Sequence, residues 1–423
     1  KDLVPGALSS YPFRLTRVGG QILFFANDPT NGQELWKSDG TAAGTVFVKD
    51  IRPGLASSAG DPRPVAVGTT LFFLADDGVS GTELWKSDGT AAGTVLVKDV
   101  FPGARSSDLD LLTRVRDRVF FVADDGGHGR ELWVSDGTEA GTRMVEDIVP
   151  GEDSSRPGNL KAVGHVLLFS AFDPVHGVEL WVSDGTEAGT ALLQDIAPGP
   201  LPSSPLAFTL AGDKIGFAAN DGVTGFEPWL LPRAALGSTF ADMPPGHWAW
   251  LSVEALADAG ITRGCAAGSY CPGSTLTRAE AAVFLGRAAH FEGYTPPAAT
   301  GTRFGDVPAG FWAADWIEQI ATDGVTQGCS ASPPLFCPGA QLSRAEMAIF
   351  LLRARHGGSY TPPPATGTRF EDIPATHWAA AWIEQLAAEG ISLGCTPTRF
   401  CPGSLVTRAE MAVFLTRAFG LTM

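Results

Sequence analysis

The chain has 423 residues, 44% of them hydrophobic, so it is long enough to form two or more domains with cores of their own. Its formal net charge of −16 argues against nucleic acid and anionic membrane surfaces as partners, because both select basic patches. No run of about twenty apolar residues occurs, so we expect no membrane span. Lys1 is not a start methionine and we identify no signal peptide, so we expect a processed or trimmed chain.

Five copies of one unit fill the first half of the chain. The motif ELW(K/V)SDGT begins at Glu34, Glu83, Glu131 and Glu179, and a divergent copy, EPWLLPRA, begins at Glu227. Successive copies are 49, 48, 48 and 48 residues apart. Short apolar runs separated by Gly, Asp, Pro and Ser turns predict about four strands per unit, which is typical of a β-propeller blade.

The fifth copy lacks the last apolar run, whereas the chain opens with KDLVPG, which matches KDIRPG at Lys49. We therefore expect residues 1–233 to form an all-β, five-bladed propeller whose N-terminal strand closes the last blade. The alternative is an array truncated upstream, in which Lys1 is only the first retained residue. The ELWxxDGTxxGT repeats resemble those of secreted bacterial proteins, and this resemblance implies a surface scaffold without a particular chemistry.

Each unit repeats one tryptophan, which we expect to pack between blades, with sugar stacking as the alternative. The loops before the motif carry acidic residues that either cap their own turns or bind calcium, the one cofactor that the sequence raises. The candidate calcium ligands are Asp28, Asp76, Asp77, Asp124, Asp125 and Asp221. A glycosidase needs two carboxylates with different roles, whereas these recur alike in nearly every unit, so we expect no enzyme activity.

A second repeat follows a linker at residues 234–239. Its three copies span residues 240–290, 304–356 and 370–423. Each copy predicts two helices. The first has one apolar face, and the second opens with a capping box, [ST]-R-A-E, at Thr277, Ser343 or Thr407.

All six cysteines lie in this second half of the chain. They form three pairs, Cys265/Cys271, Cys329/Cys337 and Cys395/Cys401. An even count at equivalent places in a repeat predicts three local disulfides and an oxidising, extracellular compartment. Zinc is the weaker alternative, because the spacing is not C-x2-C and no histidine lies at ligand spacing.

The order F-x-D-x(5)-W, G-(I/V)-x-x-G and then (T/S)-R-A-E resembles the S-layer homology (SLH) module. The resemblance implies an α-helical pseudo-trimer of three modules that anchors an exported protein to cell-envelope polysaccharide. It also implies glycan-binding clefts formed by an arginine and an aromatic residue from each module, supported by an aspartate. Carried over, these residues are Arg278, Arg344, Arg408, Trp248, Trp312, Trp378, Asp242, Asp306 and Asp372. The arginines could instead pair with an acid of a neighbouring module. The Cys-Pro-Gly loops depart from the usual loop of the family, which puts glycan binding in doubt.

The sequence therefore predicts an extracellular, cell-surface, non-enzymatic protein. The first hypothesis is attachment: the helical modules hold envelope polysaccharide while the propeller forms a binding or structural surface. The alternative is a subunit of a filament, sheath or S-layer, in which KDLVPG completes the fifth blade of a neighbouring copy by strand exchange. A glycan-active propeller enzyme is the least favoured hypothesis.

Overall fold

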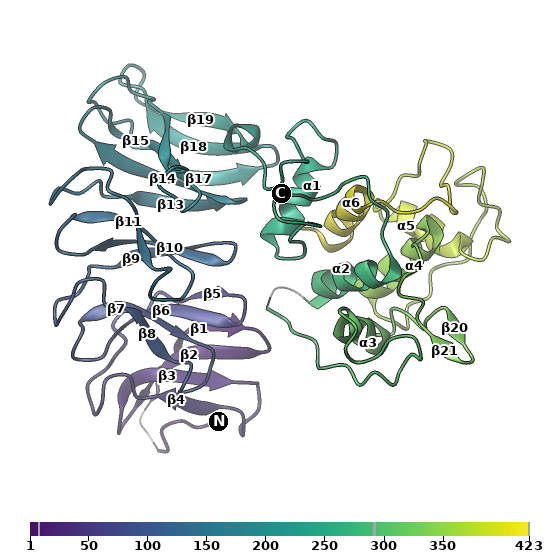
Figure 1. The fold of residues 1–423 in the computed structure, drawn as a ribbon, viewed down its shortest axis with the longest axis horizontal. Helices are drawn as coiled ribbons and strands as arrows, with labels where there is room; N and C mark the ends of the chain where they lie inside the picture. The colour runs from purple at the N-terminus through teal and green to yellow at the C-terminus, as the bar shows by residue number, and fades with distance from the viewer. Residues whose placement is uncertain (7–8, 291–292, 422–423) are drawn as a thin grey trace. The chain divides into compact units, whose positions relative to one another are not determined.

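The computed structural model describes residues 1–6, 9–290 and 293–421. The chain divides into two compact units, Lys1–Leu236 and Gly237–Met423 (Figure 1). We call them the sheet unit and the helical unit. No helix in the described part of the chain is long and apolar enough to cross a membrane.

The sheet unit consists of five antiparallel sheets that follow one another in chain order (Figure 1). The first holds β1 (Phe13–Val18), β2 (Gln21–Asp28), β3 (Gly32–Ser38) and β4 (Val46–Lys49), and the second holds β5 (Val65–Val67), β6 (Thr70–Asp76), β7 (Thr82–Ser87) and β8 (Val95–Lys98). The third holds β9 (Asp110–Val115), β10 (Arg118–Asp124), β11 (Arg130–Ser135) and β12 (Arg143–Glu146), and the fourth holds β13 (Gly158–Val163), β14 (Val166–Asp173), β15 (Gly177–Ser183) and β16 (Ala191–Gln194). The fifth has three strands, β17 (Leu206–Ala211), β18 (Lys214–Asn220) and β19 (Phe226–Pro232), followed by the 3-10 helix η1 (Arg233–Leu236).

Neighbouring sheets pack through apolar residues that alternate along the strands. Phe25 and Leu35 of the first sheet, for example, share a core with Phe73 and Trp85 of the second. The first strands of consecutive sheets lie in contact, β1 with β5, β5 with β9, β9 with β13 and β13 with β17. Trp36, Trp85, Trp133 and Trp181 are only 5–8% exposed, which supports packing over sugar stacking.

The expected closure of the propeller is not confirmed. Among the described residues, the fifth sheet has three strands and no fourth, and residues 1–6 contain no strand. Lys1 instead donates from Nζ to the Thr45 carbonyl at 2.7 Å, and Leu3 packs against Phe24 and Trp36 of the first sheet. The physical reason is that only Lys1 corresponds to a residue of an outer strand, namely Lys49 at the end of β4, and the turn residues that follow it extend no ladder.

The described residues of the helical unit form three pairs of helices. They are α1 (Trp250–Asp258) with α2 (Arg278–His290), α3 (Ala314–Thr322) with α4 (Arg344–His356), and α5 (Ala380–Ala388) with α6 (Arg408–Phe419); a two-stranded ladder, β20 (Ser330–Ala331) and β21 (Pro334–Leu335), precedes α4. Helices α2, α4 and α6 contact one another, whereas α3 packs on α2, α5 on α4 and α1 on α6. Each outer helix thus packs on the inner helix of the preceding repeat, and α1 completes the cycle against α6.

A ring of backbone hydrogen bonds lies at the start of the inner helices. The Leu276 amide donates to the Val406 carbonyl, Val406 to Leu342, and Leu342 to Leu276, each at 2.9 Å. The capping boxes form as expected, with Ser343 and Glu346 bonded reciprocally at α4 and Thr407 and Glu410 at α6. The three repeats are therefore related by a pseudo-threefold axis.

Candidate functional site

The arginines of the three R-A-E motifs are buried charged groups of the helical unit. Each one pairs with the capping-box glutamate of the next repeat in the cycle: Arg278 with Glu346 at 3.0 Å, Arg344 with Glu410 at 2.7 Å, and Arg408 with Glu280 at 3.9 Å. The arginine side chains are only 4–6% exposed. These arginines therefore tie the three repeats together.

Further contacts hold each guanidinium in place. Arg344, for example, donates from Nε to the Phe400 carbonyl at 2.9 Å and lies 5.0 Å and 5.4 Å from the ring centroids of Phe400 and Phe414. Burial lowers the pKa of Arg278 and Arg344 from the ordinary value. Arg344 also donates from Nη2 to Ser392, whereas the buried Nη2 atoms of Arg278 and Arg408 have no hydrogen-bond partner in the described part of the chain.

The three aspartates predicted to support the clefts hold the Cys-Pro-Gly loops. Asp306 accepts hydrogen bonds from the Phe336 amide at 2.8 Å and the Cys337 amide at 2.7 Å. Asp242 and Asp372 make the same pair of bonds in their own repeats. These carboxylates fix the loop that supplies the carbonyl partner of each buried arginine, so they act on the arginines through the backbone.

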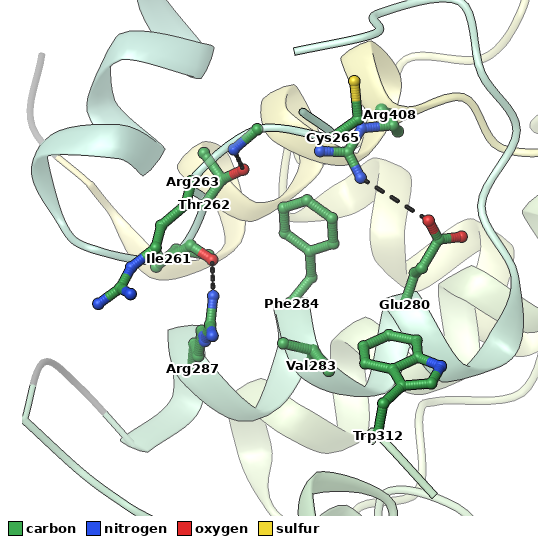
Figure 2. Close-up of a pocket in the computed structure, with 11 residues that line it drawn as sticks. Ile261, Thr262, Arg263, Cys265, Glu280, Val283, Phe284, Arg287, Trp312 and Arg408 are labelled. Carbon is green, nitrogen blue, oxygen red and sulfur yellow. Dashed lines mark hydrogen bonds and ion pairs between the residues drawn. The ribbon is translucent and has the colours of Figure 1, made fainter. Parts of the chain in front are cut away.

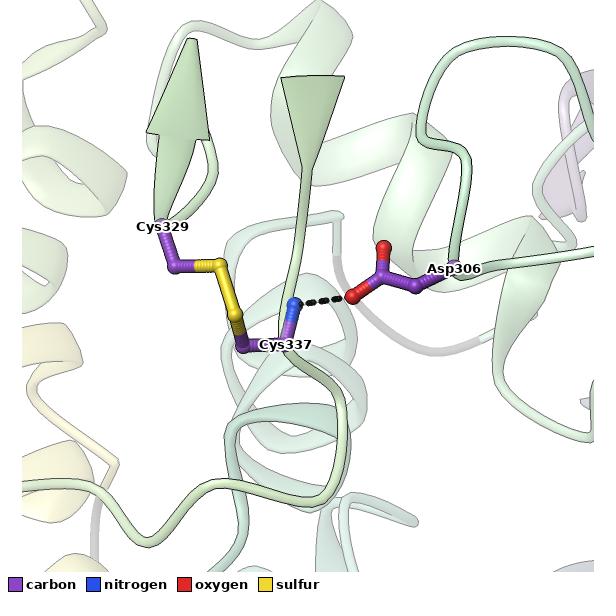
Figure 3. A group of neighbouring side chains, drawn as sticks. All are labelled: Asp306, Cys329 and Cys337. Carbon is purple, nitrogen blue, oxygen red and sulfur yellow. Dashed lines mark hydrogen bonds between the residues drawn. A yellow bond between two sulfur atoms is a disulfide. The ribbon is translucent and has the colours of Figure 1, made fainter. Parts of the chain in front are cut away.

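The cysteines form the three disulfides that the sequence predicts, Cys265–Cys271, Cys329–Cys337 and Cys395–Cys401. Asp306, Cys329 and Cys337 are close enough to resemble a metal site, and they are the one such group among the described residues (Figure 3). Because the two sulfurs are bonded to each other and the carboxylate accepts from the Cys337 amide, the group offers no thiolate ligand. It does not support the zinc alternative.

Three tryptophans lie at the surface, one per repeat. Trp248, Trp312 and Trp378 are 65%, 64% and 64% exposed. Each lies beside the ring of the residue before it, with centroids 5.6–5.8 Å apart; those residues are His247, Phe311 and His377. An exposed indole held by a neighbouring ring offers a flat apolar face, which suits a sugar ring.

One of these tryptophans borders a cavity of about 310 Å³, which we call the first cleft (Figure 2). All three repeats contribute to it: the 261–265 loop and α2 from the first, Trp312 from the second and Arg408 from the third. Arg263 and Arg287 also line it, beside the acid Glu280. The pKa of Arg287 is lowered, first by burial and then by the charge of Arg263. The first cleft therefore brings three cations and one exposed indole to a single opening.

The corresponding positions of the other repeats differ in charge. The loop GITRGC of the first repeat becomes GVTQGC and GISLGC, so that Gln327 and Leu393 stand where Arg263 stands. Arg287 has counterparts in Arg353 and Arg417. Sequence reasoning missed Arg263 and Arg287, although the fourth residue of the G-(I/V)-x-x-G loop is arginine, glutamine or leucine in the three copies.

In the sheet unit, the candidate calcium ligands serve their own turns. Asp28, Asp77, Asp125 and Asp221 each accept hydrogen bonds from two backbone amides two and three residues further on. Asp76 and Asp124 accept from Gly78 and Gly126. No three of these six aspartates come together among the described residues. The geometry supports turn capping and does not assemble a calcium site.

The glutamate of each complete ELW motif has a role that sequence reasoning missed. Glu34, Glu83, Glu131 and Glu179 are fully buried. Glu34 accepts from the Ile51 amide at 3.0 Å, the Ser58 amide at 3.0 Å and the Ser58 hydroxyl at 2.7 Å. It thereby fixes the segment between two sheets, which we call the connector and which begins here at Asp50. The constant 17- and 24-residue offsets to its partners were present in the sequence as a signal.

Comparison with known proteins agrees with this description of the helical unit. Residues 239–282 and 369–412 match the family model of the S-layer homology domain. The chain contains SLH domains. The family model matches the first and third repeats, and the structure places a third helix pair of the same arrangement between them.

Three relatives are similar to this chain over part of their length. An S-layer protein of Bacillus thuringiensis subsp. finitimus is 31% identical over 189 residues, 44% of this chain and 22% of that protein. A cellulosome-anchoring protein of Acetivibrio thermocellus is 29% identical over 157 residues, 36% of this chain and 32% of that protein. Exoglucanase XynX of Acetivibrio thermocellus is 29% identical over 179 residues, 42% of this chain and 16% of that protein.

The matches thus span a third or less of these three relatives. The SLH domains and the S-layer relatives indicate an extracellular, cell-surface protein.

Proposed function

We propose that the helical unit anchors the protein to an acidic polysaccharide of the cell envelope and that the first cleft is its main binding site. The observation that carries this proposal is the buried guanidinium of Arg408, whose Nη2 lacks a partner in the described part of the chain and which lines a cavity. An unpaired buried donor costs free energy, and a ligand carboxylate would satisfy it.

The rest of the first cleft suits the same ligand. Trp312 offers an exposed indole for stacking on a sugar ring, and Arg263 and Arg287 add positive charge. Because the whole chain carries a net charge of −16, this local concentration of cations is the feature that would attract an acidic chain.

We further propose that residues 304–356 form a third SLH module between the two that the family model matches. Its helices, capping box, aspartate, buried arginine and exposed tryptophan repeat those of its neighbours. In this proposal the modules differ in ligand affinity, since the second and third repeats carry Gln327 and Leu393 in place of Arg263.

For the sheet unit we propose a non-enzymatic scaffold made of propeller-type blades. Its repeated acidic groups are engaged in holding turns and connectors, which supports a structural role for them. The anchored helical unit would then display this scaffold at the cell surface.

Binding to purified envelope polysaccharide, measured by co-sedimentation and calorimetry, tests the anchoring proposal. Arg263→Gln introduces the residue of the second repeat, and Trp312→Ala removes the indole; each is expected to weaken binding about tenfold or more, as loss of one charged or stacking contact does. Leu393→Ala and Trp378→Ala are the matched controls and should retain most of the binding. Unchanged binding by both first-cleft variants would refute the assignment to this cleft.

A further inference from the structure

The three buried arginines of the helical unit differ in how many of their terminal nitrogens are occupied. Arg344 donates from Nη1 to Glu410 at 2.7 Å and from Nη2 to Ser392 at 3.3 Å. Arg278 donates from Nη1 to Glu346 at 3.0 Å, but its buried Nη2 donates to no described residue. Two terminal nitrogens are therefore occupied in the first of these arginines and one in the second.

Arg408, which lines the first cleft, has neither terminal nitrogen occupied (Figure 2). Its Nη1 lies 3.9 Å from Oε1 of Glu280, beyond hydrogen-bond distance, and its Nη2 is buried without a partner in the described part of the chain. Its side chain donates instead from Nε to the Tyr270 carbonyl, at 2.7 Å. Because the two terminal nitrogens of arginine match the two oxygens of a carboxylate, Arg408 retains the fork that binds such a group.

Tyr270 holds both the side chain and the backbone of Arg408. Besides accepting from Nε, it places its ring 4.9 Å from the guanidinium and donates from its hydroxyl to the Arg408 carbonyl at 2.8 Å. A phenylalanine stands at this position in the other two repeats; its carbonyl accepts from Nε in the same way, but it has no hydroxyl. The first cleft thus has an added contact that holds its arginine while both terminal nitrogens stay free.

The residue that faces Nη2 also differs between repeats. Ser392, which bonds Nη2 of Arg344, has Thr262 and Thr326 as its counterparts. The hydroxyl of each threonine accepts from the backbone amide two residues further on, at 3.1 Å, and neither is bonded to an arginine. The β-branch of threonine restricts its rotamers, so threonine and serine can present their hydroxyls differently. Thr262 lines the first cleft together with Arg408.

We propose that the first cleft binds one carboxylate of its ligand through both terminal nitrogens of Arg408, and that Tyr270 and Thr262 are the residues that make this possible. Tyr270 positions the guanidinium, and Thr262 leaves Nη2 unoccupied. Arg278 then offers one terminal nitrogen to a ligand, and Arg344 offers none. The inference rests on the proposed anchoring function and adds to it the residues that determine specificity for a carboxylate.

Calorimetric titration tests this assignment with two probes, the purified envelope polysaccharide and the same polymer after chemical reduction of its carboxylates to alcohols. The unmodified protein should bind the native polymer about tenfold or more tightly than the reduced one, because reduction removes the group that the fork binds. Thr262→Ser should weaken binding of the native polymer about tenfold, since serine at this position occupies Nη2 in the third repeat. Tyr270→Phe should weaken it about fivefold, as loss of one hydrogen bond does.

The reduced polymer separates specificity from stability. Neither Thr262→Ser nor Tyr270→Phe should change its binding, whereas a merely structural defect would weaken binding of both polymers. Tyr270→Phe installs the residue type of the other two repeats, and thermal melting verifies that both variants fold. Ser392→Thr, which makes the reverse exchange in the third repeat, is the matched control and should not weaken binding of the native polymer.

The outcomes distinguish this inference from the anchoring proposal. If the unmodified protein binds neither polymer, the anchoring proposal fails and the inference fails with it. If the unmodified protein binds both polymers equally well, anchoring stands and recognition of a carboxylate by Arg408 is overturned. The same conclusion follows if Thr262→Ser and Tyr270→Phe bind the native polymer as tightly as the unmodified protein does.

Discussion

Glu83 and Ser107, 24 residues apart, are joined twice in the interior of the sheet unit: the Ser107 amide donates to Oε1 at 2.9 Å and its hydroxyl to Oε2 at 2.8 Å. The Val100 amide adds a third hydrogen bond at 3.1 Å. The side chain of Glu83 thus organises a connector that contains no regular secondary structure.

Replacing Glu83 by alanine should destabilise the sheet unit by about 3 kcal/mol, because it leaves buried donors unsatisfied at about 1–3 kcal/mol each. Chemical denaturation followed by tryptophan fluorescence measures the loss. Glu227→Ala is the matched control at the equivalent position of the fifth sheet, and at dilute concentration it should change stability by less than about 0.5 kcal/mol. Equal effects of the two variants would show that the buried hydrogen bonds contribute little.

The same glutamates predict a pH dependence of stability. Burial raises the pKa of Glu34, Glu83 and Glu131 from the ordinary value of 4.5 to about 7. Since the folded-state pKa lies above the unfolded one, the stabilisation is complete below about 4.5 and is lost as the pH rises through 7. The sheet unit should therefore melt at a higher temperature at pH 5 than at pH 8. Glu83→Gln, which does not titrate, should reduce this difference, and a melting temperature that rises between pH 5 and pH 8 would contradict the prediction.

Much of the architecture was predictable because its signals are local or strictly repeated. Turn residues and apolar runs predicted the strands, capping boxes predicted the starts of the inner helices, and paired cysteines predicted the disulfides. The roles of the charged groups were harder to predict. Arg278 and Glu346 are 68 residues apart, and a capping-box motif indicates only what its glutamate does locally. In three dimensions the helical repeats close into a cycle, which brings Glu346 to the buried Arg278. The spacing of the motifs in the sequence does not reveal this closure.

The geometry of the N-terminal segment shows a second limit. Its likeness to a connector was visible, and it led to the expectation of a closed ring. Which sheet the segment joins depends on the path of the whole array of sheets. The local motif carries no information about that path. The structure places Lys1 on the first sheet and leaves Glu227 of the fifth exposed.

Arg344 should contribute more to folding than an exposed arginine does. Arg344→Ala leaves Glu410 without its partner and the Phe400 carbonyl without its donor, so we expect a loss of about 3–5 kcal/mol, as for other broken buried pairs. Arg399→Ala is the control, because that side chain is 60% exposed and lies 3.9 Å from Asp372. Urea denaturation followed by the helical circular dichroism signal measures the free energy of unfolding of both variants. If Arg344→Ala is as stable as Arg399→Ala, the buried arginine–glutamate pairs do not hold the three repeats together.

The disulfides and the aspartates stabilise the same loops by different means, and their contributions should be separable. Closing a loop of nine residues, as Cys329–Cys337 does, is worth about 2.5 kcal/mol in the chain-entropy estimate, so Cys329→Ser/Cys337→Ser should lose roughly that amount.

Asp306→Ala keeps the disulfide but removes the acceptor of two backbone amides, which also releases the Phe336 carbonyl that Arg278 contacts. We therefore expect Asp306→Ala to destabilise the helical unit as much as loss of the disulfide or more, and to do so in reducing and oxidising buffer alike. Urea denaturation in the two buffers measures both effects. A variant that is destabilised only in reducing buffer would show that the disulfide alone suffices to fix the loop.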